Sequence, residues 1–221
     1  MSYRTMPSAA LIVGLALLAG GCPAKMPKDH RENQAWNTRL PFLEATASQK
    51  AAEKKGLTVA AETLPKSDQK LYFSRNLRGK GFVPVLLTVT NGSDERLLIQ
   101  SADALLILPD DLEAKNTGLD PIYKKIGFSP NRFVGLNEGR LGQRYVNWKY
   151  DRAETLRNIL GDRALGSFVL EPRKTRRGFV FFAKKDVKAA SRGGEPKLRL
   201  PVEILDKIGY FDVEVPIERK R

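Results

Sequence analysis

The stretch Phe82-Val83-Pro84-Val85-Leu86-Leu87-Thr88-Val89-Thr90 decides the fold class of this chain. An apolar residue stands at every second position of it, namely Val83, Val85, Leu87 and Val89. This alternation is typical of a β-strand with one buried face. Asn91-Gly92-Ser93-Asp94 then predicts a tight turn, after which residues 96–99 resume as strand. Pro84 donates no ladder hydrogen bond and therefore indicates a sheet edge or a strand start.

Further short apolar runs, bounded by turn residues, predict the rest of a β-rich domain. The predicted strands are 57–62, a weaker one at 70–73, 104–108, 167–170, 178–182, 198–204 and 211–217. The last two alternate apolar and polar residues across the link Asp206-Lys207-Ile208-Gly209, which predicts a hairpin with one solvent-exposed face. About eight such strands predict a mainly β protein folded as a β-sandwich.

The region from about Asp110 to Gly166 interrupts this rhythm as a mixed loop and helix insertion. Residues 151–160 have the apolar spacing of a helix, and Gly161 would end it. Aromatic residues and arginines concentrate here, and Trp, Tyr and Arg are enriched at binding hot spots. We expect the insertion to form a partner-binding face. Its expected anchors are Trp148, Tyr145 and Arg144; the alternative is that these aromatics pack the insertion onto the sheet.

The N-terminus has the pattern of an export signal. Arg4 precedes the uncharged apolar run 9–18, and small residues follow it. The run is about ten residues long, and a membrane-spanning helix needs about twenty. Leu18-Ala19-Gly20-Gly21-Cys22 resembles the bacterial lipobox, although leucine is commonest in that family where Ala19 stands. The resemblance implies that residues 1–21 are a lipoprotein signal peptide, cut off after diacylglycerol is attached to the Cys22 thiol.

Cys22 is the only cysteine of the chain, so no internal disulfide accounts for it. Lipidation would account for the single cysteine. The alternative is an incidental cysteine after an ordinary signal peptide. Pro23 follows, where the family's inner-membrane retention signal is an aspartate, and the resemblance therefore implies the outer membrane, with the domain in the periplasm or at the cell surface. Residues 22–56 are expected to be the lipidated cysteine and a tether, with a short helix over 41–55.

The unit 83–99 resembles the opening of telokin-like immunoglobulin-fold domains of bacterial lipoproteins. The later turn Leu170-Glu171-Pro172-Arg173 and the glycine that opens 178–182 match the same family. These motifs cover about a quarter of the chain beyond residue 21, and the insertion at 110–166 is longer than the family usually has. The resemblance implies an immunoglobulin-like β-sandwich over 57–221 that has no catalytic residues.

The charge balance is strongly basic. Residues 1–21 contain one basic and no acidic residue, which leaves 37 Lys and Arg against 25 Asp and Glu, a net charge of +12. The basic residues lie on separate segments, which favours a solvated surface; the alternative is attraction to anionic lipid or lipopolysaccharide. Export and the absence of a basic motif interleaved with aromatics argue against nucleic acid.

The sequence contains few residues that could carry out catalysis. The only histidine, His30, lies in the expected tether, which excludes a Ser-His-Asp site on the domain and argues against a histidine-bearing metal site. Asp110, Asp111 and Glu113 could bind calcium or act as an acid and base, or be a solvated loop. We therefore expect no catalytic residue, no metal and no cofactor.

The prediction for the whole chain is a lipid-anchored, non-enzymatic lipoprotein. It would act as a binding or scaffolding module for another envelope component, in the first place a protein. The alternative is an envelope hydrolase that uses carboxylates only, which two or more buried acids in one cleft would favour.

Overall fold

The computed structural model describes residues 50–109, 112–126, 140–192 and 194–219, without the side chains of 140–149 and 219. All of them belong to one unit, Arg31–Arg221. Cys22 and His30 lie outside the described residues. Among those residues, none of the helices has the length and apolar character needed to cross a membrane.

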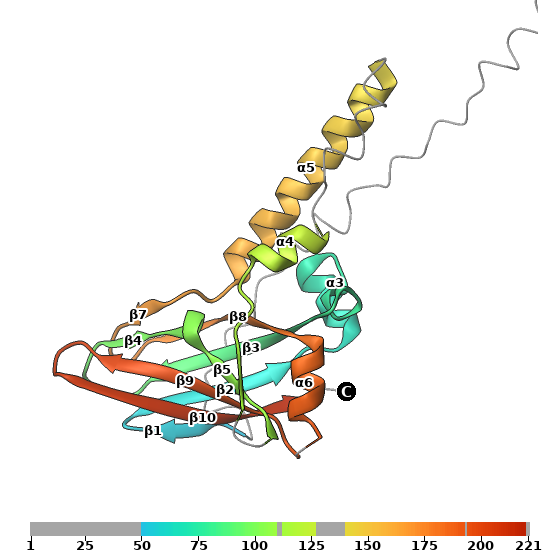
Figure 1. The fold of residues 1–221 in the computed structure, drawn as a ribbon. Coiled ribbons are helices and arrows are strands. Elements are labelled where there is room, and N and C mark those ends of the chain that lie inside the picture. Colours follow the sequence, from blue (N-terminus) through green and yellow to red (C-terminus); the bar gives the residue numbers. More distant parts are fainter. Residues whose placement is uncertain (1–49, 110–111, 127–139, 193, 220–221) are drawn as a thin grey trace, which may run out of the picture. The chain divides into compact units, whose positions relative to one another are not determined.

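The described residues form a mainly β protein around one mixed sheet (Figure 1). Its main path has the order β6-β5-β9-β10-β2-β3-β8, while β1 pairs with β2, and β4 pairs with β7 and β9. The strands are β1 (Ala52–Lys54), β2 (Leu57–Thr63), β3 (Phe82–Asn91), β4 (Leu97–Ile99), β5 (Leu105–Ile107), β6 (Glu113–Lys115), β7 (Phe168–Leu170), β8 (Thr175–Ala183), β9 (Lys197–Ile204) and β10 (Gly209–Arg219). Their pairings are antiparallel except that of β10 with β2.

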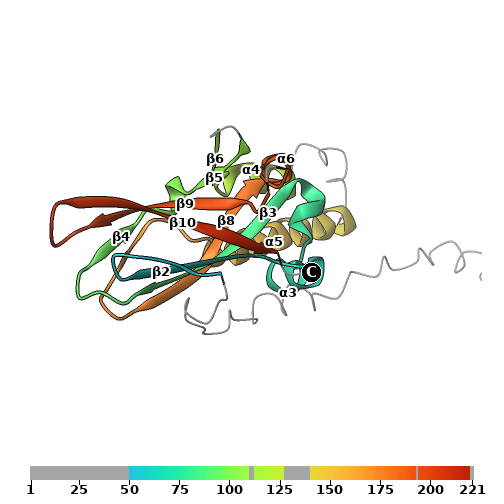
Figure 2. The same cartoon turned by 90° about the horizontal axis from the view of Figure 1, so that it is seen from below.

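The sheet curls so that its two halves face each other across a core (Figures 1 and 2). Strand β10 joins the halves, since most of it pairs with β9 and its last residues pair with the end of β2. One half contributes Val85 and Leu87 to this inner core, and the other contributes Leu200 and Val213. All four side chains are at most 1% exposed, so the burial of apolar surface between the halves is the main stabilising contribution of the sheet.

A layer of helices covers the outer face of β3 and β8. Its members are α3 (Lys66–Phe73), the short 3₁₀ helix η2 (Leu77–Lys80), α4 (Asp120–Ile126) and α5 (Arg140–Arg163). They enclose an outer core in which the rings of Phe73 and Phe179 meet edge to face, 4.8 Å apart between centroids. Helix α6 (Lys184–Ala190) instead packs Val187 and Ala190 into the inner core, and a one-turn 3₁₀ helix, η3 (Ser101–Asp103), precedes β5.

The structure confirms several of the elements that the sequence predicts. The run 82–90 is β3, and its four alternating residues all lie in the inner core. The last residue of β2, Thr63, pairs with Val85, so the pairing of β2 with β3 does not reach Pro84. Pro84 pairs with β8 alone, which agrees with its lack of a backbone N–H donor. The predicted C-terminal hairpin is β9 and β10, with Asp212 and Glu214 on the exposed face. The predicted helix 151–160 lies within the longer α5.

Two predicted elements are wrong. Residues 70–73 end helix α3 and are not a strand: Gln69 and Phe73, one turn apart, are buried on one helical face, a pattern that a four-residue window cannot reveal. The helix expected over 41–55 is wrong for its last residues, because Ala52–Lys54 is strand β1. Lys55 and Gly56 both have positive φ and form a two-residue hairpin loop, so Gly56 is a turn residue and not a helix stop.

Candidate functional site

The expected partner-binding anchors all lie on helix α5. Arg144 stands one helical turn before Trp148, and Tyr145 stands three positions before it, so the helix brings the three positions onto neighbouring surface. Their side chains lie outside the described part of the structure. The helix is 24 residues long, or about 36 Å at 1.5 Å per residue.

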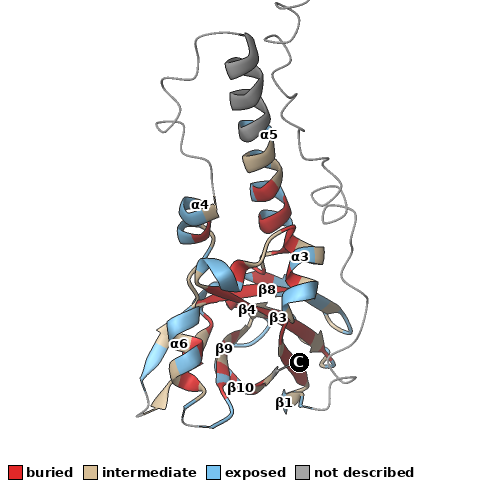
Figure 3. Cartoon of the chain, turned by 90° about the vertical axis from the view of Figure 1, so that its right-hand side faces the viewer, coloured by how far each residue is buried: buried red, intermediate tan, exposed pale blue. Residues whose placement is uncertain are grey.

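The C-terminal turns of α5 fix it to the domain. Among its described residues, burial is confined to the end next to the sheet (Figure 3), where Leu156, Ile159 and Leu160 are at most 3% exposed. The hydroxyl of Tyr123 on α4 donates to the Arg157 carbonyl at 3.2 Å. Between Tyr150 and Thr155, by contrast, no side chain is buried, and Tyr150 is 44% exposed.

Arg163, the last residue of α5, contacts Tyr72 of α3. Its guanidinium lies 5.6 Å from the centroid of the Tyr72 ring and donates to the Tyr72 carbonyl at 2.5 Å. Burial lowers the pKa of Arg163 below its ordinary value. These two contacts join the C-terminal end of α5 to α3.

The structure describes one of the three candidate carboxylates, Glu113. Asp110 and Asp111 lie outside the described residues, and Glu113 forms an ion pair with Arg199. Arg199 also pairs with Glu214 at 2.9 Å, and this Glu214 hydrogen bond raises the pKa of Arg199 above its ordinary value. Within the described ranges no Asp or Glu is buried, and no group of three His, Cys, Asp or Glu side chains could hold a metal ion. Glu113 is therefore part of a network of surface ion pairs.

A cavity that the sequence analysis missed lies beside helix α6. It has a volume of about 880 Å³ and opens between the ends of β2 and β10, the start of β3, η2, and the loop after α6. Figure 1 shows α6 next to the end of β10. Its lining residues are Lys50, Thr63, Arg78, Val83, Lys184, Val187, Lys188, Ser191, Gly194, Glu195, Pro196, Ile217 and Glu218. Volumes of this order are typical of small-molecule sites.

The strand pairing of β3 with β8 assembles this pocket. Phe82 pairs with Ala183, and the backbone N–H of Lys184 donates to the Gly81 carbonyl at 2.8 Å. These contacts bring Arg78, just before β3, to the same end of the sheet as Lys184, just after β8. The only signal in the sequence was the pair Lys184-Lys185, which in isolation indicates no more than a charged surface.

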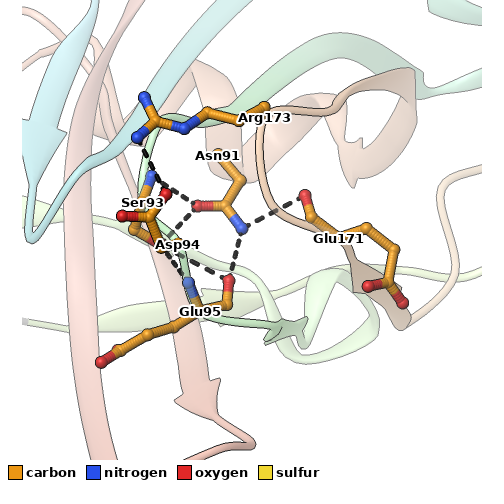
Figure 4. Close-up of polar contacts among 6 residues, drawn as sticks. All are labelled: Asn91, Ser93, Asp94, Glu95, Glu171 and Arg173. Atoms are coloured by element: carbon orange, nitrogen blue, oxygen red, sulfur yellow. Dashed lines mark hydrogen bonds and ion pairs between the residues drawn. The ribbon is translucent and has the colours of Figure 1, made fainter.

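At the other end of β3, a buried amide ties together the loops that follow the strands (Figure 4). Asn91 is fully buried, and its Nδ2 donates to the carbonyls of Glu95 at 2.8 Å and Leu170 at 3.1 Å. Its Oδ1 accepts from the backbone N–H of Ser93 at 3.0 Å, and Arg173 pairs with Asp94 at 2.9 Å. The turn predicted at 91–94 is confirmed, and its polar side chains bind the chain itself.

Comparison with known proteins does not assign this chain to a family. No protein-family model matches the chain, and no curated protein matches it. Among solved structures that match is the yjhA protein from Bacillus subtilis, with a TM-score of 0.37 and 7% identity over 78% of this chain and 97% of that chain. Another is a functionally unknown protein from Listeria monocytogenes EGD-e, with a TM-score of 0.36 and 10% identity over 77% and 81%. Similarities of this size establish neither a shared fold nor a shared function.

Proposed function

We propose that this chain is a lipid-anchored, non-enzymatic envelope lipoprotein whose domain binds another envelope component, in the first place a protein. The lipobox-like run before Cys22 supports the anchor, and Pro23 supports the outer membrane as its location. Residues 23–51 separate that cysteine from the first strand, so the domain could work at a distance from the membrane. Fully extended, a segment of this length reaches on the order of 100 Å.

We place the domain in the immunoglobulin-like β-sandwich class. Support for this class comes from the mostly antiparallel strands that face each other across one core. The turn after β3 and the proline-containing turn before β8, on which the family resemblance rests, are joined through Asn91. The helical layer on β3 and β8 would then be an addition to that class.

Helix α5 is the proposed partner-binding element, and the distribution of burial along it carries the proposal. Its last two turns are packed into the domain, whereas no described side chain from Tyr150 to Thr155 is buried. A helix held rigidly at one end can present its other end to a partner with little loss of conformational entropy. Arg144, Tyr145 and Trp148, all toward that end, are the proposed anchors.

The carboxylate-only hydrolase gains no support from the described residues. Such an enzyme needs two carboxyl groups in one cleft, one of them with a raised pKa. The acids that line the pocket beside α6 are Glu195 and Glu218, and Glu195 pairs with Lys50. A binding module accounts better for the arrangement of charges.

The anchor is tested with Cys22→Ser in the full chain. The lipoprotein peptidase of the family acts on the modified cysteine, so the variant should take up no fatty-acid analogue and should stay uncut. Labelling and gel mobility, measured in cells that express wild type or variant, check both effects. Equal labelling of the two chains would rule out the lipoprotein proposal.

The binding face is tested with Trp148→Ala. If Trp148 is an anchor, capture of the partner from solubilised envelope should fall by about thirtyfold, equivalent to about 2 kcal/mol, while the melting temperature stays nearly constant. Leu156→Ala is the control on the same helix, since Leu156 is buried and its loss should lower the melting temperature. A large drop in melting temperature for Trp148→Ala would assign Trp148 to packing and overturn α5 as the binding element.

A further inference from the structure

The pocket beside α6 has an excess of positive charge. Four basic side chains line it against two acidic ones, which gives its wall a net charge of +2. Glu195 is neutralised by Lys50. Arg78, Lys184 and Lys188 remain against Glu218, and among the described residues these three cations form no ion pair.

The three cations come from two elements that the sheet holds in place. Lys184 and Lys188 are four residues apart on α6, so they project from the same face of the helix. Arg78 belongs to η2, whose capping residue Asn76 accepts a hydrogen bond from Gly79 at 3.1 Å. The backbone N–H of Arg78 donates to the Gln69 side chain, which is itself buried. The backbone that carries the cations is therefore ordered before any ligand arrives.

Part of the pocket lining is apolar. Val83, Val187 and Ile217 line it, and all three belong to the inner core with exposures of 6% or less. The hydroxyl of Ser191 donates to the Val187 carbonyl at 2.6 Å, so its proton is already committed to the protein. Because the three apolar side chains are almost fully buried, the accessible lining consists mainly of charged and polar groups, which suit a ligand with an anionic group.

We propose that this pocket binds a ligand that carries a phosphate monoester, with Arg78, Lys184 and Lys188 as the residues that hold the phosphate. A phosphate monoester carries a charge between about −1.5 and −2 near pH 7 and thus matches the excess of +2, whereas a single carboxylate would neutralise half of it. Arginine and lysine are also the side chains that bind phosphate oxygens most strongly. The site is independent of the lipid anchor and of helix α5.

The test is calorimetric titration of the full chain, purified from cells in a neutral detergent whether or not it is lipidated. Two probes are compared, inorganic phosphate and dihexanoyl phosphatidic acid, a short-chain lipid whose headgroup is a phosphate monoester. Dihexanoyl phosphatidylcholine, a zwitterionic phosphodiester with no net charge, serves as the reference. We expect saturable binding of at least the phosphatidic acid. Binding of both probes would indicate that a soluble phosphate suffices, and binding of the lipid alone would indicate a lipid headgroup; each result supports a phosphate site.

A pair of charge reversals on one helix isolates the pocket. Lys188 lines it and the neighbouring Lys185 does not, although both are exposed on α6. Lys188→Glu should weaken binding by about tenfold or more, because a charged hydrogen bond is lost and a repulsion is gained. Lys185→Glu, with the same change in net charge, should change it by less than about twofold, since a solvated charge is largely screened. Equal losses in the two variants, or no saturable binding of either probe by the wild type, would overturn the proposal.

Discussion

The two faces of strand β3 are both buried, but against different kinds of structure. On the inner face, Val85 and Leu87 meet the opposite half of the curled sheet. On the outer face, Leu86 meets the helices, and Thr88 lies under the guanidinium of Arg177. The inner contacts are entirely apolar, whereas the outer ones combine apolar packing with a charged hydrogen bond.

The inner core and the outer core are therefore stabilised in different ways. The inner core is formed mainly by strands that are hydrogen-bonded into one sheet, with Val187 and Ala190 of α6 added, so most of it can only be lost when the sheet separates. The outer core depends on helices contributed by distant segments, among them Phe73 on α3 and Ile122 on α4. Elements attached mainly through side chains can open locally while the rest of the domain stays folded.

Leu87→Ala should give the largest effect. The side chain is fully buried in the inner core, and its truncation leaves a cavity between the two halves of the sheet. Because the halves are joined through β10, they cannot close freely over that cavity. We expect a loss of about 2–5 kcal/mol in the free energy of unfolding, measured by urea denaturation. A variant as stable as the wild type would mean that Leu87 does not lie on the inner face. The assignment of residues to the two faces would then be wrong.

The inner face could be predicted from sequence because its information is local. Each inner residue of β3, β9 and β10 stands two positions from the next, and a period of two identifies both the strand and its buried side. The outer face could not be predicted in this way. Pro84 and Thr88 lie on it, and whether such a face is covered depends on helices elsewhere in the chain.

The helices themselves were partly predictable. Residues 151–160 were long and periodic enough to identify α5, whereas α6 is only seven residues long and directly continues strand β8. The pocket beside α6 was beyond prediction for a related reason. Arg78 and Lys184 are far apart in the sequence, and only the register of β3 with β8 places them together. The anchors on α5 were chosen from composition, and that choice stays a prediction.

Leu86→Ala should have a smaller effect that is confined to the outer layer. Leu86 is 5% exposed and packs under the helices, which can shift to fill part of the cavity. We expect a loss of about 2 kcal/mol, at the low end for buried leucines. Hydrogen exchange should accelerate in α3 and α4 more than in β9 and β10. Equal acceleration in all four elements would show that the two cores unfold as one, against the distinction drawn above.

Thr88→Ala should have the smallest effect of the three and tests the polar part of the outer face. Thr88 is 5% exposed, and its hydroxyl accepts a hydrogen bond from Nε of Arg177 at 2.8 Å. Burial lowers the pKa of Arg177 below its ordinary value, and the nearby Glu62 partly offsets that shift. Because Glu62 continues to stabilise the guanidinium, we expect a loss of only about 1 kcal/mol in urea denaturation.

Thr88→Ser is the matched control for this hydrogen bond, since it keeps the hydroxyl and removes only a methyl group. It should recover most of the stability that Thr88→Ala loses if the bond to Arg177 is what stabilises the site. If serine and alanine are equally destabilising, the methyl group is responsible, and the outer face is held by apolar packing alone, like the inner one. If alanine at this position costs as much as Leu87→Ala, the guanidinium depends on Thr88 far more than its electrostatic attraction to Glu62 implies. The first result would remove the contrast between an apolar inner face and a mixed outer face, and the second would overturn the expected order of the Leu87 and Thr88 effects.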